Sequence, residues 1–299
     1  MSHAAAFSLA EPLDWRYRVA AWSMLRLSVD DVAALRKSPE AFFSPNAKPF
    51  PLKHADDQTI GGLAAVFRAV DAFGLGTADF SSWGVAAMPR FIGRITVAKT
   101  WERYKIDGPW GVSMQLVPHN TLHSQASTIT LALGSHGPAI GAGGGQGSEA
   151  DAALAALTML HWAPDDGVWM IWTGWSPELE VDSEQRRLTD SRMVALALAI
   201  QGVAKPEDVS RFRIHAGALV PRDPRGAALG VTEQPVDAIA VLDRCCQIEA
   251  TSLALALDLG GDLRLDLDLR PPIFAPRVPA PLGAKFSGAL SSSSTEKSA

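Results

Sequence analysis

A glycine-rich turn is the stretch of this sequence whose residue types and spacing could best perform chemistry. An apolar run that can be extended begins at Gly137, five glycines follow between Gly141 and Gly147, and a helix-forming run extends from Ala152 to Leu160. Glycine tolerates positive φ and close backbone approach, so a strand, turn and helix of this kind can push a side chain or several N–H groups outward. The turn is therefore the first candidate for a functional site.

The residue at the apex of this turn is Gln146, and glutamine is not a nucleophile. Its amide donates and accepts hydrogen bonds but cannot be ionised or usefully acylated. We expect Gln146 either to contribute to a binding pocket or to be a satisfied polar residue of the turn. Ser148 is expected to cap the following helix, with Asp151 three residues on as a rough capping box.

The same glycines are also compatible with a phosphate-binding loop. Residues 145–150, Gly-Gln-Gly-Ser-Glu-Ala, fit the G-x-G-x-x-A variant of the dinucleotide fingerprint. Against this hypothesis, the turn lies mid-chain, the next expected strand has no acidic residue at its tip, and the nearest one is Glu178. The chain also has no Gly-Lys-Ser/Thr of a P-loop. A nucleotide-dependent enzyme that uses the Gly141–Gly147 loop is kept as an alternative.

Histidines and cysteines are the other candidates for chemistry. His119 and His123 lie four residues apart and could, with His136, suggest a metal, but no His-Glu-x-x-His motif supports one. The two cysteines, Cys245 and Cys246, are adjacent in a mostly apolar helical segment, which favours buried thiols over a disulfide or metal ligands. No metal site and no cofactor are predicted.

Composition narrows the function classes. The chain has 299 residues, is 47% hydrophobic and carries a net charge of -5 without a long basic run, so a sizeable core is expected and nucleic-acid binding is not. The first ten residues lack the features of a signal peptide, and no apolar run reaches the length of a membrane span. A cytoplasmic protein that does not bind membranes is predicted.

Strands alternating with helices predict a layered α/β domain over residues 1–270, followed by a Pro/Ser-rich mobile tail over 271–299. Alternation of leucine with charged residues over 262–269 predicts a half-exposed strand at a sheet edge. The run 193–200 fits a strand or a helix. Other strands are expected at 19–27, 83–88, 167–173 and 212–220, and helices at 30–36, 57–73, 91–105, 119–133, 152–162 and 236–257.

The segment from Pro118 to Ala150 resembles the nucleophile elbow of the thiolase-like β-ketoacyl synthases. It contains Pro118-His119-Asn120, a helical run to Leu133, Gly137-Pro138-Ala139 and the glycine turn. Counted from Gly137-Pro138 without a gap, the reactive Cys of that family falls on Gln146, as in the chain-length factor subunits of type II polyketide synthases. Residues 113–120 and 168–177 are similar to chain-length-factor-like proteins of aryl polyene pathways.

This chain also departs from that family. The resemblance covers about residues 80–180 and is looser over 19–76 and 193–220. The two histidine motifs of a condensing synthase, His-Gly-Thr-Gly-Thr and Gly-His-Asn, are absent, as is its Gly-Phe-Gly-Gly loop, and His215 is the only histidine after His161. Condensation needs a thiolate, and malonyl decarboxylation depends on those histidines. The resemblance therefore implies a shortened, inactive relative.

The resemblance implies a truncated thiolase-like fold with a mixed sheet, in which a central strand feeds a buried helix after the elbow. It implies a non-catalytic, chain-length-factor-like subunit that pairs with an active ketosynthase in polyketide or fatty-acid-type biosynthesis. A homodimeric pseudoenzyme that binds acyl chains or acyl carrier protein is another alternative. The implied elbow or acyl-pocket residues are Gly144, Gly145, Gln146, Gly147 and Ser148, and the implied interface residues are Ala139, Ile140, Gly141, Ala142, His119 and Asn120.

Overall fold

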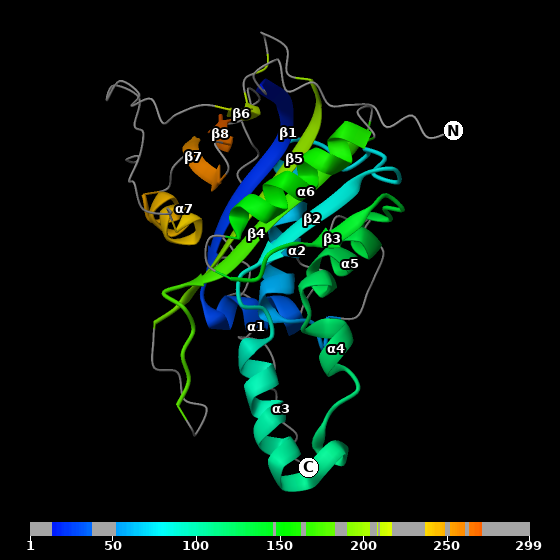
Figure 1. Cartoon of the computed structure of the whole chain (residues 1–299), viewed down its shortest axis with the longest axis vertical. Coiled ribbons are helices and arrows are strands. Elements are labelled where there is room, and N and C mark those ends of the chain that lie inside the picture. Colours follow the sequence, from blue (N-terminus) through cyan, green and yellow to red (C-terminus); the bar gives the residue numbers. More distant parts are fainter. Residues whose placement is uncertain are drawn as a thin grey trace, which may run out of the picture.

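One mixed eight-stranded sheet organises the chain, in the order β3-β2-β4-β5-β1-β6-β8-β7 (Figure 1). The structure, a computed structural model, describes residues 14–37, 52–145, 148–162, 166–182, 190–203, 208, 210–216, 237–248, 252–260 and 263–270. The strands are β1 (Asp14–Leu27), β2 (Gly84–Pro89), β3 (Ala139–Gly141), β4 (Gly167–Ser176), β5 (Arg192–Val203), β6 (Arg211–Ala216), β7 (Leu253–Gly260) and β8 (Leu263–Leu269).

Helices cover both faces of this sheet, and two of them are short. They are α1 (Val29–Lys37), α2 (Asp57–Ala72), α3 (Arg94–Asp107), the 3-10 helix η2 (Gly108–Gly111), α4 (Leu116–His119), α5 (Leu122–Leu133), α6 (Glu149–Trp162) and α7 (Ala238–Gln247). None of the helices that the structure describes combines the length and the apolar character needed to cross a bilayer.

Strands β2, β3 and β4 are parallel, and the other described pairs are antiparallel. The carboxyl ends of the three parallel strands therefore open at the same end of the sheet. In open α/β sheets, loops that follow the carboxyl ends of neighbouring strands form ligand crevices. The turn after β2, the glycine turn after β3 and the loop after β4 are thus brought together by topology.

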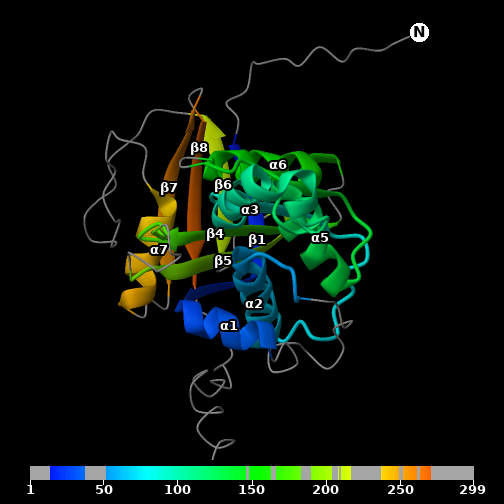
Figure 2. The ribbon, with the colours of Figure 1, turned by 90° about the horizontal axis from the view of Figure 1, so that it is seen from below.

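Successive side chains of β4 point to opposite faces of the sheet and pack into two separate cores. Trp169 and Ile171 point into a core shared with α1, α2 and α5, whereas Met170 and Trp172 point into a second core shared with α6 and α7. Because both faces of this strand are covered, its sequence is apolar at nearly every position. Figure 2 shows α1 and α2 on one side of β4 and β5, and α6 on the other.

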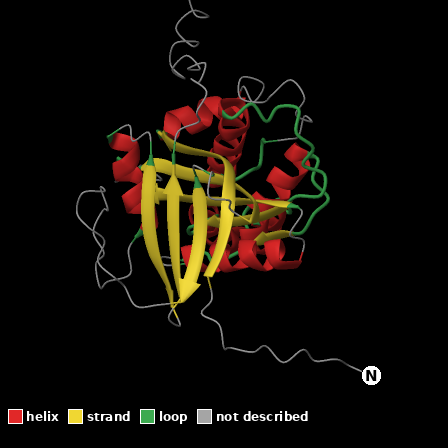
Figure 3. Ribbon diagram, turned by 90° about the horizontal axis from the view of Figure 1, so that it is seen from above, coloured by secondary structure: helices red, strands yellow, loops and turns green. Residues whose placement is uncertain are grey.

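The antiparallel strands β6, β8 and β7 turn away from the direction of β4 and β5 (Figures 2 and 3). Leu265, Leu267 and Leu269 of β8 are buried in the same core as α6 and α7. The curved end of the sheet therefore helps to enclose the buried face of α6. Trp162, at the carboxyl end of α6, is 82% exposed.

Helix α3 differs from the rest of the fold because it projects away from the sheet (Figure 1). None of its residues is buried. Helix α3 runs into η2, and the chain then returns to the body through α4, which contacts α5.

The predicted layered α/β fold with a mixed sheet is confirmed, and so is a helix directly after the glycine turn. Two details differ. Strand β3 lies at the edge of the sheet of this single chain and not at its centre, because it pairs with β2 alone. Helix α6 buries one face, including Ala153 and Leu157, while Asp151 is exposed on another.

The C-terminal expectations need a larger correction. The helix predicted over 236–257 ends at Gln247, and the leucines after it form β7, because their alternation matches the pairing of β7 with β8. Strand β8 is not the sheet edge, since β6 and β7 flank it on both sides. Its Arg264 is buried and paired with Asp266 at 3.1 Å. The proposed tail, 271–299, lies outside the described residues.

Candidate functional site

The glycine turn after β3 requires glycine at several positions. Gly143 and Gly144 have φ of 72° and 128°, which side chains strongly disfavour. A Cβ on Gly143 would lie 2.4 Å from Cβ of Ser148, and one on Gly141 would lie 2.1 Å from the Leu122 carbonyl oxygen. The turn is thus folded tightly on itself and against the start of α5.

Ser148 holds the turn closed. Its Oγ accepts a hydrogen bond from the Gly144 N–H at 3.1 Å and donates one to the Gly145 carbonyl at 2.5 Å. Its own carbonyl accepts the Asp151 N–H at 3.0 Å as α6 begins. The described bonds of the Ser148 hydroxyl point back into the turn, so the expected side-chain cap of α6 is not what this hydroxyl provides. Gln146 and Gly147, the predicted apex, lie outside the described residues.

The turn after β2 forms the neighbouring wall. The Phe91 N–H donates to the Gly144 carbonyl at 2.8 Å, and the Ala142 N–H donates to the Ala87 carbonyl at 2.8 Å. Phe91 adopts φ of 55°, an uncommon value for a bulky residue. A strained residue held by its surroundings is a frequent feature of functional sites, so this joint between the two turns belongs to the candidate site.

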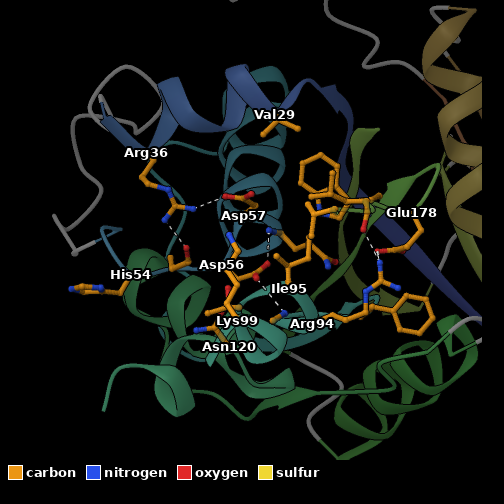
Figure 4. A pocket seen from close by; sticks show the side chains of 18 residues that line it. Val29, Arg36, His54, Asp56, Asp57, Arg94, Ile95, Lys99, Asn120 and Glu178 are labelled. Carbon is orange, nitrogen blue, oxygen red and sulfur yellow. Dashed lines mark hydrogen bonds and ion pairs between the residues drawn. The ribbon is translucent and has the colours of Figure 1, made fainter. Parts of the chain in front are cut away.

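On the other side of Phe91 lies a cavity of about 350 Å³ between the root of α3, the start of α2 and the loop after β4 (Figure 4). Two ion pairs line it. Arg36 Nη2 lies 2.6 Å from Asp57 Oδ1, and Arg94 Nη2 lies 3.2 Å from Glu178 Oε1. Burial raises the pKa of Glu178, an effect that Arg94 and then Arg90 partly offset.

Asp56 lies between these ion pairs, at the start of α2. Its carboxylate accepts the Gln58 N–H at 2.9 Å, which caps α2, and the Gly93 N–H at 3.2 Å. Burial raises the pKa of Asp56 to about 6, against the smaller opposing effect of the Gln58 hydrogen bond. Asp56 therefore joins α2 to the first residue before α3, and it changes charge near neutral pH.

A buried polar network lies beneath the cavity. Gln125 Nε2 donates to the Gln58 carbonyl at 2.7 Å and to Thr173 Oγ1 at 3.0 Å, and Gln58 Nε2 donates to the Arg90 carbonyl at 2.6 Å. All four residues are buried. Because each comes from a different segment, the network fixes α2, α5, β4 and the turn after β2 relative to one another.

The Arg90 side chain extends the site toward α7. Its Nη1 lies 2.6 Å from Asp237 Oδ1, and its Nη2 donates to the Trp175 carbonyl at 2.7 Å. Asp237 also caps α7, since its carboxylate accepts the Ala240 N–H at 3.1 Å. A buried guanidinium thus joins the end of β2, the end of β4 and the start of α7.

The predicted site residues divide between these walls. Gly144, Gly145 and Ser148 form the glycine turn, and Ala139–Ala142 lead into it at the sheet edge. Asn120 lies elsewhere, lining the cavity beside Gly93. His119 is the last residue of α4 and stands near His54, with ring centroids 5.9 Å apart. The cavity around Asp56 was missed because its residues are distant in sequence; the Asp-Asp-Gln start of α2 is the signal that could have indicated it.

The remaining candidates for chemistry are structural where they are described. Burial raises the pKa of Cys245, and it raises that of Cys246 to about 11, so both thiols stay protonated at neutral pH. His161 stacks on Trp15 with centroids 6.0 Å apart. Within the described ranges, no group of three or more potential ligands is arranged to hold a metal ion. The side chain of His215 lies outside the described residues.

The strand order argues against the dinucleotide hypothesis. The first strand–helix–strand unit of a dinucleotide-binding fold joins adjacent strands. Here α6 connects β3 to β4, and β2 lies between them. Glu178, the nearest acid after β4, is engaged by Arg94.

Comparison with known proteins finds similarity to solved structures, three of which are described here. No protein-family model and no curated protein matches the sequence. A ketosynthase in complex with its chain length factor from Xenorhabdus doucetiae overlaps with a TM-score of 0.45 and 9% identity, covering 84% of this chain and 99% of that one. A type II polyketide synthase acyl carrier protein in complex with its hexaketide-bound ketosynthase gives 0.41 and 13%, covering 62% and 64%. The ishigamide ketosynthase/chain length factor gives 0.39 and 14%, covering 62% and 58%.

All three are ketosynthase structures or their complexes. They belong to the group that the Pro118–Ala150 segment resembles in sequence. The overlaps are partial, and this chain spans only 64% and 58% of the chains in the acyl-carrier-protein complex and the ishigamide protein.

Proposed function

We propose that this chain is a non-catalytic, ketosynthase-like subunit that pairs with an active β-ketoacyl synthase and shapes the acyl channel of that partner. The observation that carries the proposal is an edge strand, β3, which among the described strands pairs with β2 alone and leads directly into a glycine turn without a cysteine. The absence of a cysteine in the turn favours a subunit without condensing activity. The edge position of β3 favours contact with a second subunit.

The chemistry of the elbow favours a pocket-shaping role. The turn is fixed by Ser148 and by the hydrogen bond from Phe91 to Gly144, so its backbone is preorganised. Its apex position holds Gln146, which cannot form an acyl thioester. The protonated thiols of Cys245 and Cys246 offer no thiolate at neutral pH. A turn whose described residues are held in this way, and which carries no nucleophile, is suited to limit the length of a neighbouring acyl chain.

The flank that carries β3 has the composition of a subunit interface. Residues 108–148 contain no Asp, Glu, Lys or Arg, in a chain that is 20% charged. This segment supplies α4, α5 and β3, and it exposes Leu131 and 41% of Ile140. Depletion of charge together with exposed apolar side chains is typical of the core of a protein interface.

The arrangement proposed is the one named for the Xenorhabdus doucetiae structure, a ketosynthase with its chain length factor. Ala139–Ala142 and His119 would face the partner, and Gly144–Ser148 would line the channel. An acyl carrier protein would then reach the pair through the active subunit. No cofactor is needed for this role.

Co-expression with each ketosynthase of the source genome tests the proposal. We expect one of them to form a 1:1 complex by light scattering and to make products of altered chain length. Ile140→Asp should abolish the complex. Ile248→Asp, which places a charge at an exposed isoleucine directly after α7, should not. A chain that binds none of these enzymes, or that forms only dimers of itself, would overturn the proposal.

A further inference from the structure

The arm, residues 94–111 of α3 and η2, contains no buried residue. Trp110 at the far end is 96% exposed. Met114, which follows the arm, is 90% exposed. Tryptophan and methionine are costly to leave in water, so the arm is a surface that favours a covering partner.

The arm also lacks the local interactions that would hold such a helix in water by itself. Helices of this length are marginal without tertiary packing. Thr96, Val97 and Thr100 are β-branched residues with modest helix propensity, and no side chain caps the first turn. The Lys105–Glu102 pair is exposed and contributes little.

The root of the arm is nevertheless fixed to the body. Asp56 accepts the N–H of Gly93, the residue before α3, at 3.2 Å. Arg94 Nη2 donates to the Leu179 carbonyl at 2.7 Å and pairs with Glu178. Gly93 has φ of 70° and lies against Asn120, where a Cβ would stand 2.5 Å from the Asn120 carbonyl oxygen. The arm is therefore held in one direction before any partner binds.

Exposed apolar side chains recur along the chain from the arm to the strand at the sheet edge. Val97, Trp101 and Tyr104 share one face of α3 by spacing, and the two aromatic rings stack with centroids 5.7 Å apart. Of the thirteen exposed large apolar residues in the described ranges, nine lie between positions 97 and 140. These nine are Val97, Trp101, Tyr104, Ile106, Trp110, Met114, Val117, Leu131 and Ile140.

We propose that the arm is a clasp that lies on the partner ketosynthase subunit and contributes to the same interface as β3. This inference rests on the proposed function. Helix α4 carries the chain from the arm back to α5, and α5 contacts β3, so a subunit placed against β3 and α5 meets the arm as well. A stable interface buries about 800 Å² per partner. Nine large side chains spread over this surface match a subunit-sized partner better than a short peptide.

Charge indicates what the partner presents at the arm. The arm carries Arg94, Lys99, Arg103 and Lys105 against Glu102 and Asp107, in a chain whose net charge is -5. By helical spacing, Arg94 and Lys105 lie beside the face of α3 that carries Val97, Trp101 and Tyr104, so a partner surface that is acidic at its rim is favoured. The two carboxylates within the arm disfavour burial in lipid, and the exposed apolar residues continue beyond the arm to Leu131 and Ile140. A protein surface is therefore favoured over a membrane.

The experiment compares single variants of the full chain with the ketosynthase that it binds. Trp101→Ala and Trp110→Ala should each raise the Kd at least tenfold, because interface tryptophans are frequent hot spots. Trp162→Ala removes a tryptophan that is 82% exposed on α6, outside the flank, and serves as the matched control with no change in Kd. Hydrogen exchange of the arm amides should slow in the complex.

The outcomes separate the two proposals. If the wild type binds and Ile140→Asp abolishes binding, while both arm variants bind like wild type, the clasp is wrong and the proposed function stands. If the wild type binds no ketosynthase, the proposed function fails, and the clasp fails with it. A self-dimer broken by Trp110→Ala, or binding of the arm to anionic phosphatidylserine vesicles, would assign the arm to a different partner and also overturn the clasp.

Discussion

The N–H of Phe91 donates to the carbonyl of Gly144 at 2.8 Å, which joins the turn after β2 to the glycine turn after β3. Both residues hold unusual backbone conformations, with φ of 55° and 128°. The joint lies where the parallel strands open, between the elbow and the cavity around Asp56. A change that moves one of these turns is therefore expected to move the other as well.

Gly143→Ala tests the geometry of the glycine turn. The new Cβ would meet Ser148 at 2.4 Å and would also require φ of 72°. We expect a loss of roughly 1–3 kcal/mol in the free energy of unfolding. Gly145→Ala is the matched control, because a Cβ there has no heavy atom within 4 Å. Equal urea midpoints for the two variants would contradict this account of the turn.

Gln125→Met tests the buried polar network. Methionine preserves the volume of the side chain but leaves the Gln58 carbonyl without its donor and removes a partner of Thr173. The expected loss is about 1–3 kcal/mol. Gln115→Met, at an exposed glutamine, should change stability by less than about 0.5 kcal/mol. Chemical denaturation measures both, and a neutral Gln125→Met would show that the network does not stabilise the fold.

Arg90→Gln tests the junction between β2, β4 and α7. The substitution leaves Asp237 without its cation and the Trp175 carbonyl without its donor, so a loss of about 3 kcal/mol is expected. Arg94→Gln, at a more exposed arginine, should cost less than about 1 kcal/mol. If the two variants lose the same free energy of unfolding, the buried contacts of Arg90 do not stabilise the fold more than the exposed contacts of Arg94.

Asp56 predicts a pH dependence of stability. Its pKa rises from about 4 in the unfolded chain to about 6 in the fold. Between these values the folded chain retains a proton that the unfolded chain has lost, so this group lowers stability as the pH rises from about 4 to about 6. Asp56→Asn keeps a good helix cap and should remove this slope. At pH 7 it should raise stability by roughly 1–3 kcal/mol.

Urea denaturation at several pH values checks the effect of Asp56, with Asp107→Asn as the control for an exposed carboxylate away from the cavity. A slope that persists in Asp56→Asn would assign the pH dependence to another group.

The raised thiol pKa values predict low cysteine reactivity. Alkylation of Cys246 by iodoacetamide at pH 7.5 should be at least about tenfold slower than that of a free thiol, because its pKa is about 11. Urea should restore the normal rate. Mass spectrometry follows the reaction, and rapid labelling of the folded protein would show that a thiolate is accessible.

Local patterns in the sequence were sufficient for much of the sheet and for the helix that follows the glycine turn. The apolar runs of β2 and β4, the helical spacing of α2 and the glycine cluster each predict their element from neighbouring residues alone. Pattern failed after α7, because the leucines of 253–257 suit a helix or a strand until β8 is present to pair with them. The alternation of leucine with charged residues also led to the wrong prediction that β8 lies at the sheet edge. Alternation alone does not show that β6 and β7 pair with β8 on its two sides.

The sequence by itself determined the composition of the glycine turn: glycines that permit it, a serine at position 148, and a glutamine at the position that the family resemblance assigns to a nucleophile. Only the tertiary structure decided that β3 is an edge, that α3 leaves the body, and that Asp56, Gly93 and Glu178 meet around one cavity. The reason is that these relationships join segments as far as 122 positions apart (56 to 178), and long-range contacts depend on the packing of the whole sheet, which no local pattern contains.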